Sequence, residues 1–139
     1  MARAVLGGGC FWCVEGAYKD MKGIKSALPG YAGGHDPHPN YNSVCNGSTG
    51  HAEVVEIIFD DSVISYETIL EVFFTVHDPT QLNRQGNDIG TQYRSVIYYL
   101  DDEQKLTADK VRDDFQKYFD DEIVTEIEEL SNYHEAECQ

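Results

Sequence analysis

Hydrophobic and polar residues alternate most regularly in residues 51–59. A period of two is that of a β-strand, in which successive side chains point to opposite faces. One face of the predicted strand carries Glu53, Val55, Ile57 and Phe59. A single carboxyl group therefore shares a largely apolar face. Burial there would raise its pKa and keep it protonated near neutral pH, as a general acid requires, whereas a place at the strand end would leave it in water without a role.

Two later stretches have the period of a helix. Ser65 is a good N-cap for the first stretch, which ends where Asp78 and Pro79 interrupt it. Its apolar stripe consists of Ile69, Leu70, Phe73, Phe74 and Val76. The second stretch covers residues 102–119, with apolar positions at roughly helical intervals. These positions are Leu106, Val111, Phe115 and Phe119. Both helices are expected to pack an apolar face on a sheet.

Shorter apolar runs complete the predicted elements. Strands are expected at residues 4–6, 24–26, 93–100 and 123–127. A further helix is expected from about Cys10 to Gly23, since apolar residues recur there at helical spacing and glycine often ends a helix. The chain has no internal repeat or linker, so residues 1–139 are expected to form a single catalytic domain. Its expected architecture is an α+β or α/β sandwich with helices packed on a mixed sheet.

Two irregular segments lie between these elements. Residues 29–50 hold all but one of the prolines, and a segment of this length in a compact domain is usually functional or disordered. Tyr31 and Tyr41 favour a function, because disordered segments are poor in aromatic residues. The second segment, residues 80–92, is polar and carries Arg84, Asn87 and Asp88.

The acidic balance of the chain narrows its partners. Its 139 residues carry a formal net charge of -15, and the pI is near 4.4, which argues against nucleic acids and anionic membrane surfaces as partners. The acidic residues of segments 101–103, 113–114 and 120–137 are expected on solvated faces. No apolar run approaches the ~18 residues of a membrane span, and residues 1–6 are too short for a secretion signal. A reducing cytoplasm is therefore the expected location.

Cysteines in such a setting are redox, catalytic or metal-binding candidates before they are structural disulfides. The chain has four: Cys10, Cys13, Cys45 and Cys138. Cys10 follows three glycines and lies in or beside the first turn of the predicted helix, where unpaired N–H groups and the helix dipole favour the nucleophilic thiolate. Phe11 and Trp12 next to it suggest the apolar wall of a pocket. A core cysteine flanked by core aromatics is the alternative interpretation.

Together these residues suit one kind of substrate. Cys10 supplies a nucleophile and Glu53 a proton, while the hydroxyl groups of Tyr41 and Tyr93 can hold an oxygen. The substrate would have a small apolar group and one oxygen that must be protonated to leave. A sulfoxide has both features.

Five motifs, all in the same order, give the chain a family resemblance. They are Gly-Cys-Phe-Trp-Cys-Val-Glu (9–15), Gly-Tyr-Ala-Gly-Gly (30–34), Thr-Gly-His-Ala-Glu-Val-Val (49–55), His-Asp-Pro-Thr (77–80) and Asn-Arg-Gln-Gly-Asn-Asp-Ile-Gly-Thr-Gln-Tyr-Arg-Ser (83–95). From about residue 7 to residue 127 the chain resembles the A-type peptide methionine sulfoxide reductases. The resemblance implies a two-layer α/β fold with a ferredoxin-like core. It also implies reduction of the S epimer of methionine sulfoxide, free or in proteins, as repair after oxidation.

The resemblance further implies a role for each site residue. Cys10 would be the nucleophile and Glu53 the proton donor, in agreement with the residue chemistry. Tyr41 and Tyr93 would bind the sulfoxide oxygen, and Phe11 and Trp12 would hold the methyl group. Asp88 would support the polar side of the site. Asp88 rests on the resemblance alone. Neither a cofactor nor a metal ion is expected, a monomer is expected, and thioredoxin or another thiol would be the reductant.

The sequence leaves three candidates for the second thiol of the catalytic cycle. Attack of Cys10 on the sulfoxide sulfur would leave Cys10 as a sulfenic acid, which a second thiol converts to a disulfide. Cys13 is close in sequence, and Cys138 would lie on a truncated or mobile tail of about residues 128–139. Both are candidates, and direct attack by an external thiol is the third route. Cys45 is expected to pack against the core.

Two other functions are alternatives to a sulfoxide reductase. Cys10 and Cys13 form a Cys-x-x-Cys pair at a helix start, as in thioredoxin-like disulfide exchangers, which would leave the acid and the tyrosines without a role. The non-enzymatic alternative is a zinc-binding module with cysteines and His35 or His38 as ligands. Structural zinc sites usually show two close ligand pairs, and the second pair here lies in a proline-rich loop. His77 is expected to pack or hydrogen-bond near the site.

Overall fold

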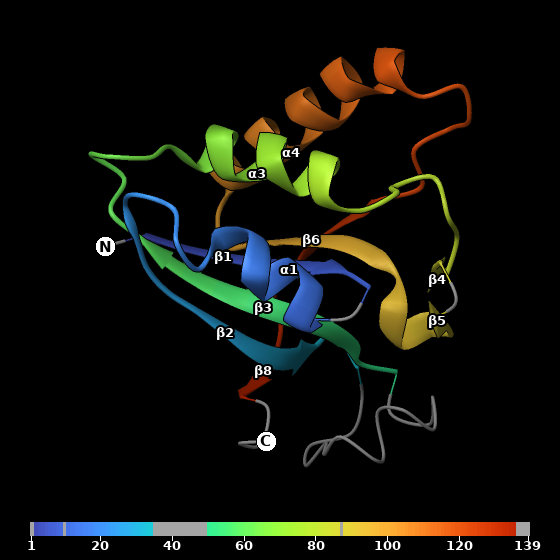
Figure 1. Cartoon of the computed structure of the whole chain (residues 1–139), viewed down its shortest axis with the longest axis horizontal. Coiled ribbons are helices and arrows are strands. Elements are labelled where there is room, and N and C mark those ends of the chain that lie inside the picture. The colour runs from blue at the N-terminus through green and yellow to red at the C-terminus, as the bar shows by residue number, and fades with distance from the viewer. Residues whose placement is uncertain (1, 10, 35–49, 87, 136–139) are drawn as a thin grey trace.

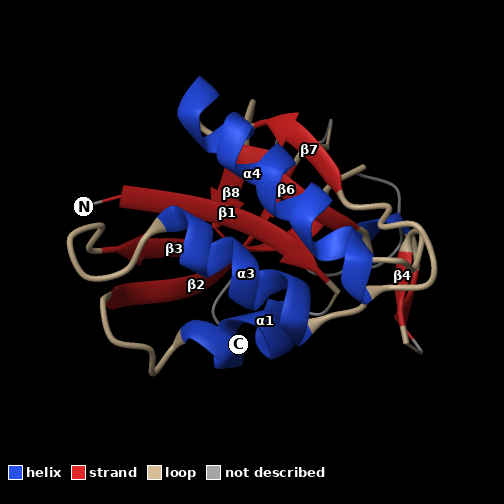
Figure 2. Cartoon of the chain, turned by 90° about the horizontal axis from the view of Figure 1, so that it is seen from above, coloured by secondary structure: helices blue, strands red, loops and turns tan. Residues whose placement is uncertain are grey.

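A six-stranded mixed sheet forms the base of the computed structural model, which describes residues 2–9, 11–34, 50–86 and 88–135. Helices α1, α3 and α4 cover one face of this sheet (Figure 1 and Figure 2). The helices span Phe11–Tyr18 (α1), Tyr66–Val76 (α3) and Asp102–Phe115 (α4). The strands of the sheet are β1 (Ala2–Gly8), β2 (Ile24–Ala32), β3 (Ala52–Phe59), β6 (Ser95–Tyr99), β7 (Glu126–Glu129) and β8 (Tyr133–Glu135). A two-stranded sheet pairs β4 (Arg84–Gln85) with β5 (Asp88–Ile89), and two 3-10 turns are η1 (Thr91–Tyr93) and η2 (Gln116–Tyr118).

The strands follow the order β7-β6-β1-β3-β2-β8 across the sheet. The four central strands come from the chain order β1-α1-β2-β3-α3-β6, and each neighbouring pair among them is antiparallel. This is the ferredoxin-like arrangement. The edge pair β6 and β7 is parallel, so the sheet is mixed. The predicted α+β class, the mixed sheet and the ferredoxin-like core are confirmed.

Apolar side chains are buried on both faces of the sheet. The main core lies between the sheet and the helices; its members include Leu6, Val55, Ile57, Ile69, Leu70, Phe73 and Ile97. A smaller core on the other face contains Val5, Ala32, Ala52, Val54, Val96 and Tyr98. Leu130 and Tyr133 of the C-terminal segment pack against this second core. Because β3 is central and covered on both sides, all its residues from Ala52 to Val55 are buried.

The strongest sequence signals correspond to observed elements. The alternating segment forms β3, and Ser65 caps α3 by accepting a hydrogen bond of 3.1 Å from the Thr68 N–H. Asp101 caps α4 in the same way, through the Gln104 N–H at 2.8 Å. These side chains satisfy N–H groups that have no partner within their helices.

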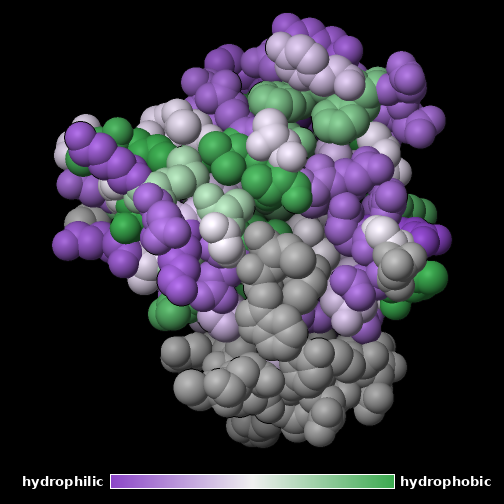
Figure 3. Space-filling model, viewed as in Figure 1, coloured by the Kyte–Doolittle hydropathy of each residue, from purple (hydrophilic) through white to green (hydrophobic). Residues whose placement is uncertain are grey.

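The acidic surface agrees with its prediction in large part. Asp101, Asp102, Asp113 and Asp114 are exposed, and Figure 3 shows hydrophilic residues over much of the face that bears α4. Hydrophobic residues on that face gather near α3. One member of the predicted apolar stripe of α4 is misplaced, because Leu106 is 70% exposed whereas Ala108 and Val111 are buried. The helix therefore packs through a narrower stripe than its sequence indicates.

The first helix is shorter than predicted. It ends at Tyr18, and two turns lead from there to β2, with the Met21 N–H donating to the Tyr18 carbonyl. Gly23 has a φ of 93° and belongs to the second of these turns. Met21 still packs against the core, so its place in the apolar pattern reflects tertiary contact and not helical structure.

The segment after Gly23 differs most from its prediction. Strand β2 runs to Ala32, beyond the predicted 24–26, through residues expected to be irregular. Pro29 lacks an N–H donor, but the described part of β8 pairs only with Gly30, Tyr31 and Ala32, so no described residue of β8 pairs with Pro29. Gly30 leaves the space that the Tyr133 ring fills. Turn-forming residues thus serve strand packing here.

The ends of the remaining strands also shift. Strand β6 begins at Ser95, so Tyr93 lies in η1 and not in the strand as predicted, and the polar loop before it contains β4 and β5. The last predicted strand, 123–127, is displaced to Glu126–Glu129, where it pairs with β6. Residues 133–135, within the predicted tail, form β8 beside β2. None of the helices in the described part of the chain is long and apolar enough to cross a membrane.

Candidate active site

Glu53 lies in the second position of β3 and is only 2% exposed. It shares the helix-facing side of the strand with Val55, Ile57 and Phe59, all of which belong to the main core. Its register partner in β2 is Tyr31, which is fully buried. The burial predicted from the period of two is confirmed, and the alternative place in water is wrong.

The C-terminal end of β1 passes close to Glu53. A Cβ added to Gly7 would lie 3.1 Å from the Glu53 carbonyl oxygen. A Cβ on Gly8 would lie 3.0 Å from Cε1 of Phe73 and 3.1 Å from Cγ of His77. Glycines therefore let β1 approach both β3 and the end of α3 closely. Cys10 follows this glycine segment in the sequence.

His77 is anchored where α3 ends. Its Nδ1 lies 2.7 Å from the Phe73 carbonyl oxygen, and its Nε2 lies 2.7 Å from Oγ of Ser95. Ser95 Oγ in turn lies 2.7 Å from Oγ1 of Thr125. Burial lowers the pKa of His77 to about 4, so the imidazole is neutral at physiological pH. The expectation that His77 packs and hydrogen-bonds in this region is confirmed.

Gln85 covers the last glycine of the segment. Gly9 has a φ of 94°, a left-handed conformation that glycine adopts most easily, and a Cβ there would lie 2.7 Å from Cγ of Gln85. The Gln85 amide makes two bonds to the backbone of Asp78: its Oε1 accepts from the N–H at 2.7 Å, and its Nε2 donates to the carbonyl at 2.9 Å. The residue falls within the fifth motif, but no periodicity singled it out.

The two other described site residues differ in exposure. Tyr93 ends η1 and is partly exposed, next to the buried Gln92. Asp88 begins β5 and is exposed. Gly90, with a φ of 146°, makes the bend between β5 and η1.

The remaining predicted residues fall wholly or partly outside the described structure. Cys10, Tyr41, Cys45 and Cys138 lie outside the described residues. Phe11, Trp12 and Cys13 form the start of α1, while their side chains lie outside the described part. A helix does begin at the residue after Cys10, as predicted.

Comparison with known proteins identifies the family. The model of a family described as peptide methionine sulfoxide reductase matches residues 2–139. This chain belongs to that family. The reductase MsrA of Natronomonas pharaonis is 55% identical over 138 residues, which cover 98% of this chain and 78% of the relative. A solved structure has the same fold: Mxr1 of Saccharomyces cerevisiae in reduced form has a TM-score of 0.93 at 34% identity, and the match covers 98% of this chain and 80% of that chain. A complex of Mxr1 with Trx2 has a TM-score of 0.74 at 25% identity, with coverage of 98% and 81%.

Membership in the peptide methionine sulfoxide reductase family favours the reductase over the two alternative functions. For the zinc module, no group of three or more potential metal ligands occurs among the described residues, and His35 and His38 lie outside them.

Proposed function

We propose that this protein reduces the S epimer of methionine sulfoxide to methionine, free or within oxidised proteins, and so repairs oxidative damage. The observation that carries the proposal is the buried side chain of Glu53, in a strand whose backbone at Glu53 lies against the glycine segment that leads to Cys10. Desolvation favours the neutral carboxylic acid, which can donate a proton. The relatives named peptide methionine sulfoxide reductase support the same chemistry.

The proposed reaction starts at Cys10. Its thiolate attacks the sulfoxide sulfur while Glu53 protonates the sulfoxide oxygen. Methionine leaves with its sulfur reduced by two electrons. Cys10 is oxidised by two electrons and keeps the oxygen as a sulfenic acid, the reversible first stage of thiol oxidation.

Substrate binding is assigned to the residues around this pair. Tyr93 and Tyr41 would hold the sulfoxide oxygen through their hydroxyl groups. The position of Tyr93 on η1, which packs against β3, supports this role. Phe11 and Trp12 would enclose the methyl group, and Asp88 would support the polar side of the site.

A second thiol completes the proposed cycle. It condenses with the sulfenic acid to a disulfide and releases water, and thioredoxin or another thiol then reopens the disulfide by exchange. The complex of Mxr1 with Trx2 supports a thioredoxin as the reductant. Cys13, Cys138 and an external thiol remain the candidates for the second thiol. A monomer in the reducing cytoplasm, expected from the sequence, also remains a prediction.

Single-turnover kinetics with separated epimers test the function. Without any reductant, the S epimer should yield one equivalent of methionine per enzyme, and the R epimer should yield none. Equal turnover of both epimers, or none of either, would overturn the proposal. Reduction of insulin disulfides without sulfoxide turnover would favour the disulfide exchanger instead.

A further inference from the structure

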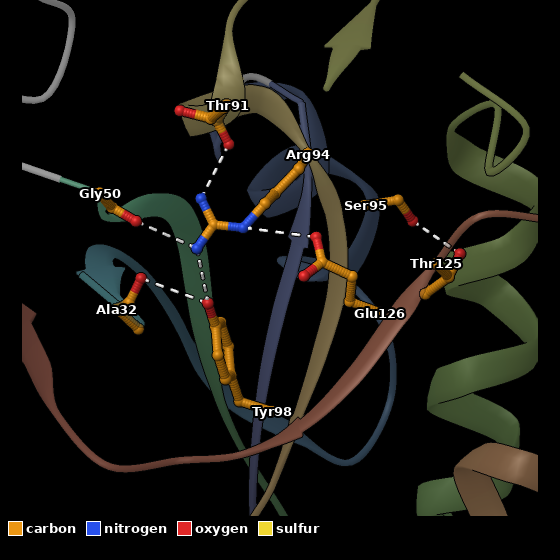
Figure 4. A network of polar contacts seen from close by, with 8 residues as sticks. All are labelled: Ala32, Gly50, Thr91, Arg94, Ser95, Tyr98, Thr125 and Glu126. Atoms are coloured by element: carbon orange, nitrogen blue, oxygen red, sulfur yellow. Dashed lines mark hydrogen bonds and ion pairs between the residues drawn. The ribbon is translucent and has the colours of Figure 1, made fainter. Parts of the chain in front are cut away.

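The guanidinium group of Arg94 joins segments that are far apart in the sequence (Figure 4). Its Nη1 donates to the Thr91 carbonyl at 2.9 Å, the same oxygen that accepts the Arg94 backbone N–H at the end of η1. Its Nη2 donates to the Gly50 carbonyl at 3.1 Å and to the Tyr98 hydroxyl at 3.2 Å. Its Nε lies 3.6 Å from Oε2 of Glu126. Four segments of the chain therefore converge on a single side chain.

The guanidinium group of Arg94 is well placed to fix the relative positions of these segments. The Arg94 side chain is 11% exposed, whereas that of Glu126 is 40% exposed, and their ion pair is long. This ion pair is long and its carboxylate is partly solvated, so it contributes little, and the three hydrogen bonds define the position of the guanidinium. A planar guanidinium offers several donors in a rigid fork, which the single ammonium group of a lysine cannot reproduce.

Tyr98 extends the connection to β2. Its hydroxyl accepts from Arg94 and donates to the Ala32 carbonyl at 3.3 Å (Figure 4). Burial raises the pKa of Tyr98, so the hydroxyl keeps its proton and can donate. Gly33, with a φ of 80°, passes directly against this hydroxyl and leaves no room for a side chain. The end of β2 is thus held on the same group.

These contacts connect two described members of the proposed site, Tyr93 and Glu53. Tyr93 directly precedes Arg94 and belongs to the turn that Arg94 closes through Thr91. Gly50 lies three residues before Glu53, at the entrance to β3. The hydrogen bond from Arg94 to Gly50 therefore links the turn that carries Tyr93 to the start of the strand that carries Glu53.

We propose that Arg94 is a positioning residue for sulfoxide reduction. It holds Tyr93 and Glu53 at a fixed separation, so that one sulfoxide oxygen is bound by the tyrosine and protonated by the acid in the same geometry. Arg94 itself touches neither the substrate nor the reacting atoms. The inference rests on the proposed function, since it concerns the same site.

Variants of the full-length enzyme separate positioning from simple stabilisation. Arg94→Lys keeps the charge but loses the fork, and Arg94→Ala loses both. Glu126→Gln is the matched control, because it removes the ion pair and leaves the three hydrogen bonds of the guanidinium. Single-turnover rates and KM for the S epimer are measured well below the unfolding temperature of each variant, together with circular dichroism.

Arg94→Lys should stay folded and lose about 10- to 100-fold in kcat/KM, with a change in kcat as well as in KM, since misplacement by about 1 Å costs up to about 100-fold. Millimolar guanidinium chloride, compared with sodium chloride at equal ionic strength, should restore part of the activity of Arg94→Ala. Glu126→Gln should match the wild type. Folded Arg94→Lys with wild-type kcat and KM would overturn the proposal, even if Arg94→Ala fails to fold. Absence of turnover in the wild-type enzyme would instead refute the proposed function.

Discussion

Nε2 of His77 accepts a hydrogen bond of 2.7 Å from the Ser95 hydroxyl. The direction follows from the other ring nitrogen, because Nδ1 faces the Phe73 carbonyl, which can only accept. Nδ1 therefore carries the proton of the neutral ring, and Nε2 is the acceptor. Ser95 then accepts from the Thr125 hydroxyl. A directed chain of hydrogen bonds thus runs from β6 to the end of α3, beside the glycine segment.

The chain of hydrogen bonds through His77 predicts that the stability of the fold depends on pH. The folded protein holds His77 neutral, with a pKa of about 4, whereas in the unfolded chain the ring takes up a proton near its ordinary value of 6.5. Stability is therefore full above pH 6.5 and falls as the pH drops toward 4. Between pH 7.5 and pH 5 the loss due to His77 should be at most about 2 kcal/mol.

Urea unfolding of the wild type and of His77→Asn at both pH values measures this loss. The variant should lose less stability than the wild type over the same interval. Asp78 does not interfere, because hydrogen bonds from Thr80 hold the pKa of its carboxyl group below 3.8. An equal pH dependence in the two proteins would show that His77 is not the titrating group.

A second prediction concerns the acid. Glu53→Gln should leave KM nearly unchanged and slow the single-turnover rate by roughly 10² to 10⁴, the usual contribution of a general acid. Glu56→Gln is the control from the same strand. Its side chain is partly exposed and pairs with Arg3, so its loss should leave the rate unaltered. A normal rate in Glu53→Gln would remove Glu53 as the proton donor.

Sequence patterns were sufficient where a local rule and the tertiary structure agree. The period of two in β3 revealed the buried face of Glu53, and the cap at Ser65 revealed the start of α3. They failed in β2, where Pro29 and Gly30 are typical of turns. Their place in a strand depends on the pairing of β2 with β3 and on the ring of Tyr133, neither of which is local in sequence.

The same distinction holds for the site. The chemistry of Cys10 and Glu53 is visible in residue type and spacing. Arg94 and Gln85 act through backbone carbonyls and glycines, and such partners leave no periodicity in the sequence. Both residues lie within the fifth motif of the family resemblance. That place marks them as candidates but does not indicate which residues they contact.

A third prediction uses two glycines as a matched pair. Gly8→Ala would press a methyl group against Phe73 and His77, and the latter is held by hydrogen bonds on both sides and cannot yield. It should lower the free energy of unfolding by about 1–3 kcal/mol. Gly16 lies in α1, and beyond its chain neighbours and the backbone of the helix, no atom of the described side chains or other segments lies within 4 Å of an added Cβ. Gly16→Ala should therefore raise the free energy of unfolding by about 0.5–1 kcal/mol.

Denaturant titrations of both variants at pH 7.5 provide the measurement. Opposite signs are the expected outcome. Destabilisation by Gly16→Ala would mean that α1 needs the glycine for a reason other than helix propensity. Tolerance of Gly8→Ala would mean that the His77 ring is free to move away from β1.

The last prediction concerns the second thiol. The described chain ends at Glu135, which pairs with Gly30, one residue along β2 from the register partner of Glu53. The three residues from there to Cys138 span at most about 10 Å. Cys13 is three residues from Cys10 in sequence. Either thiol is therefore a candidate for an internal disulfide, and we expect one to form.

Mass spectrometry after a single turnover without reductant decides between the routes. An internal disulfide lowers the mass by two hydrogens, whereas a stable sulfenic acid adds one oxygen. If Cys138 is the second thiol, Cys138→Ser should accumulate the sulfenic acid and Cys13→Ser should still close the disulfide; the reverse pattern would assign Cys13. Cys10→Ser should show neither mass change nor methionine, since a serine hydroxyl is hardly ionised at neutral pH. Added oxygen in the wild type would exclude both internal thiols and leave attack by an external one.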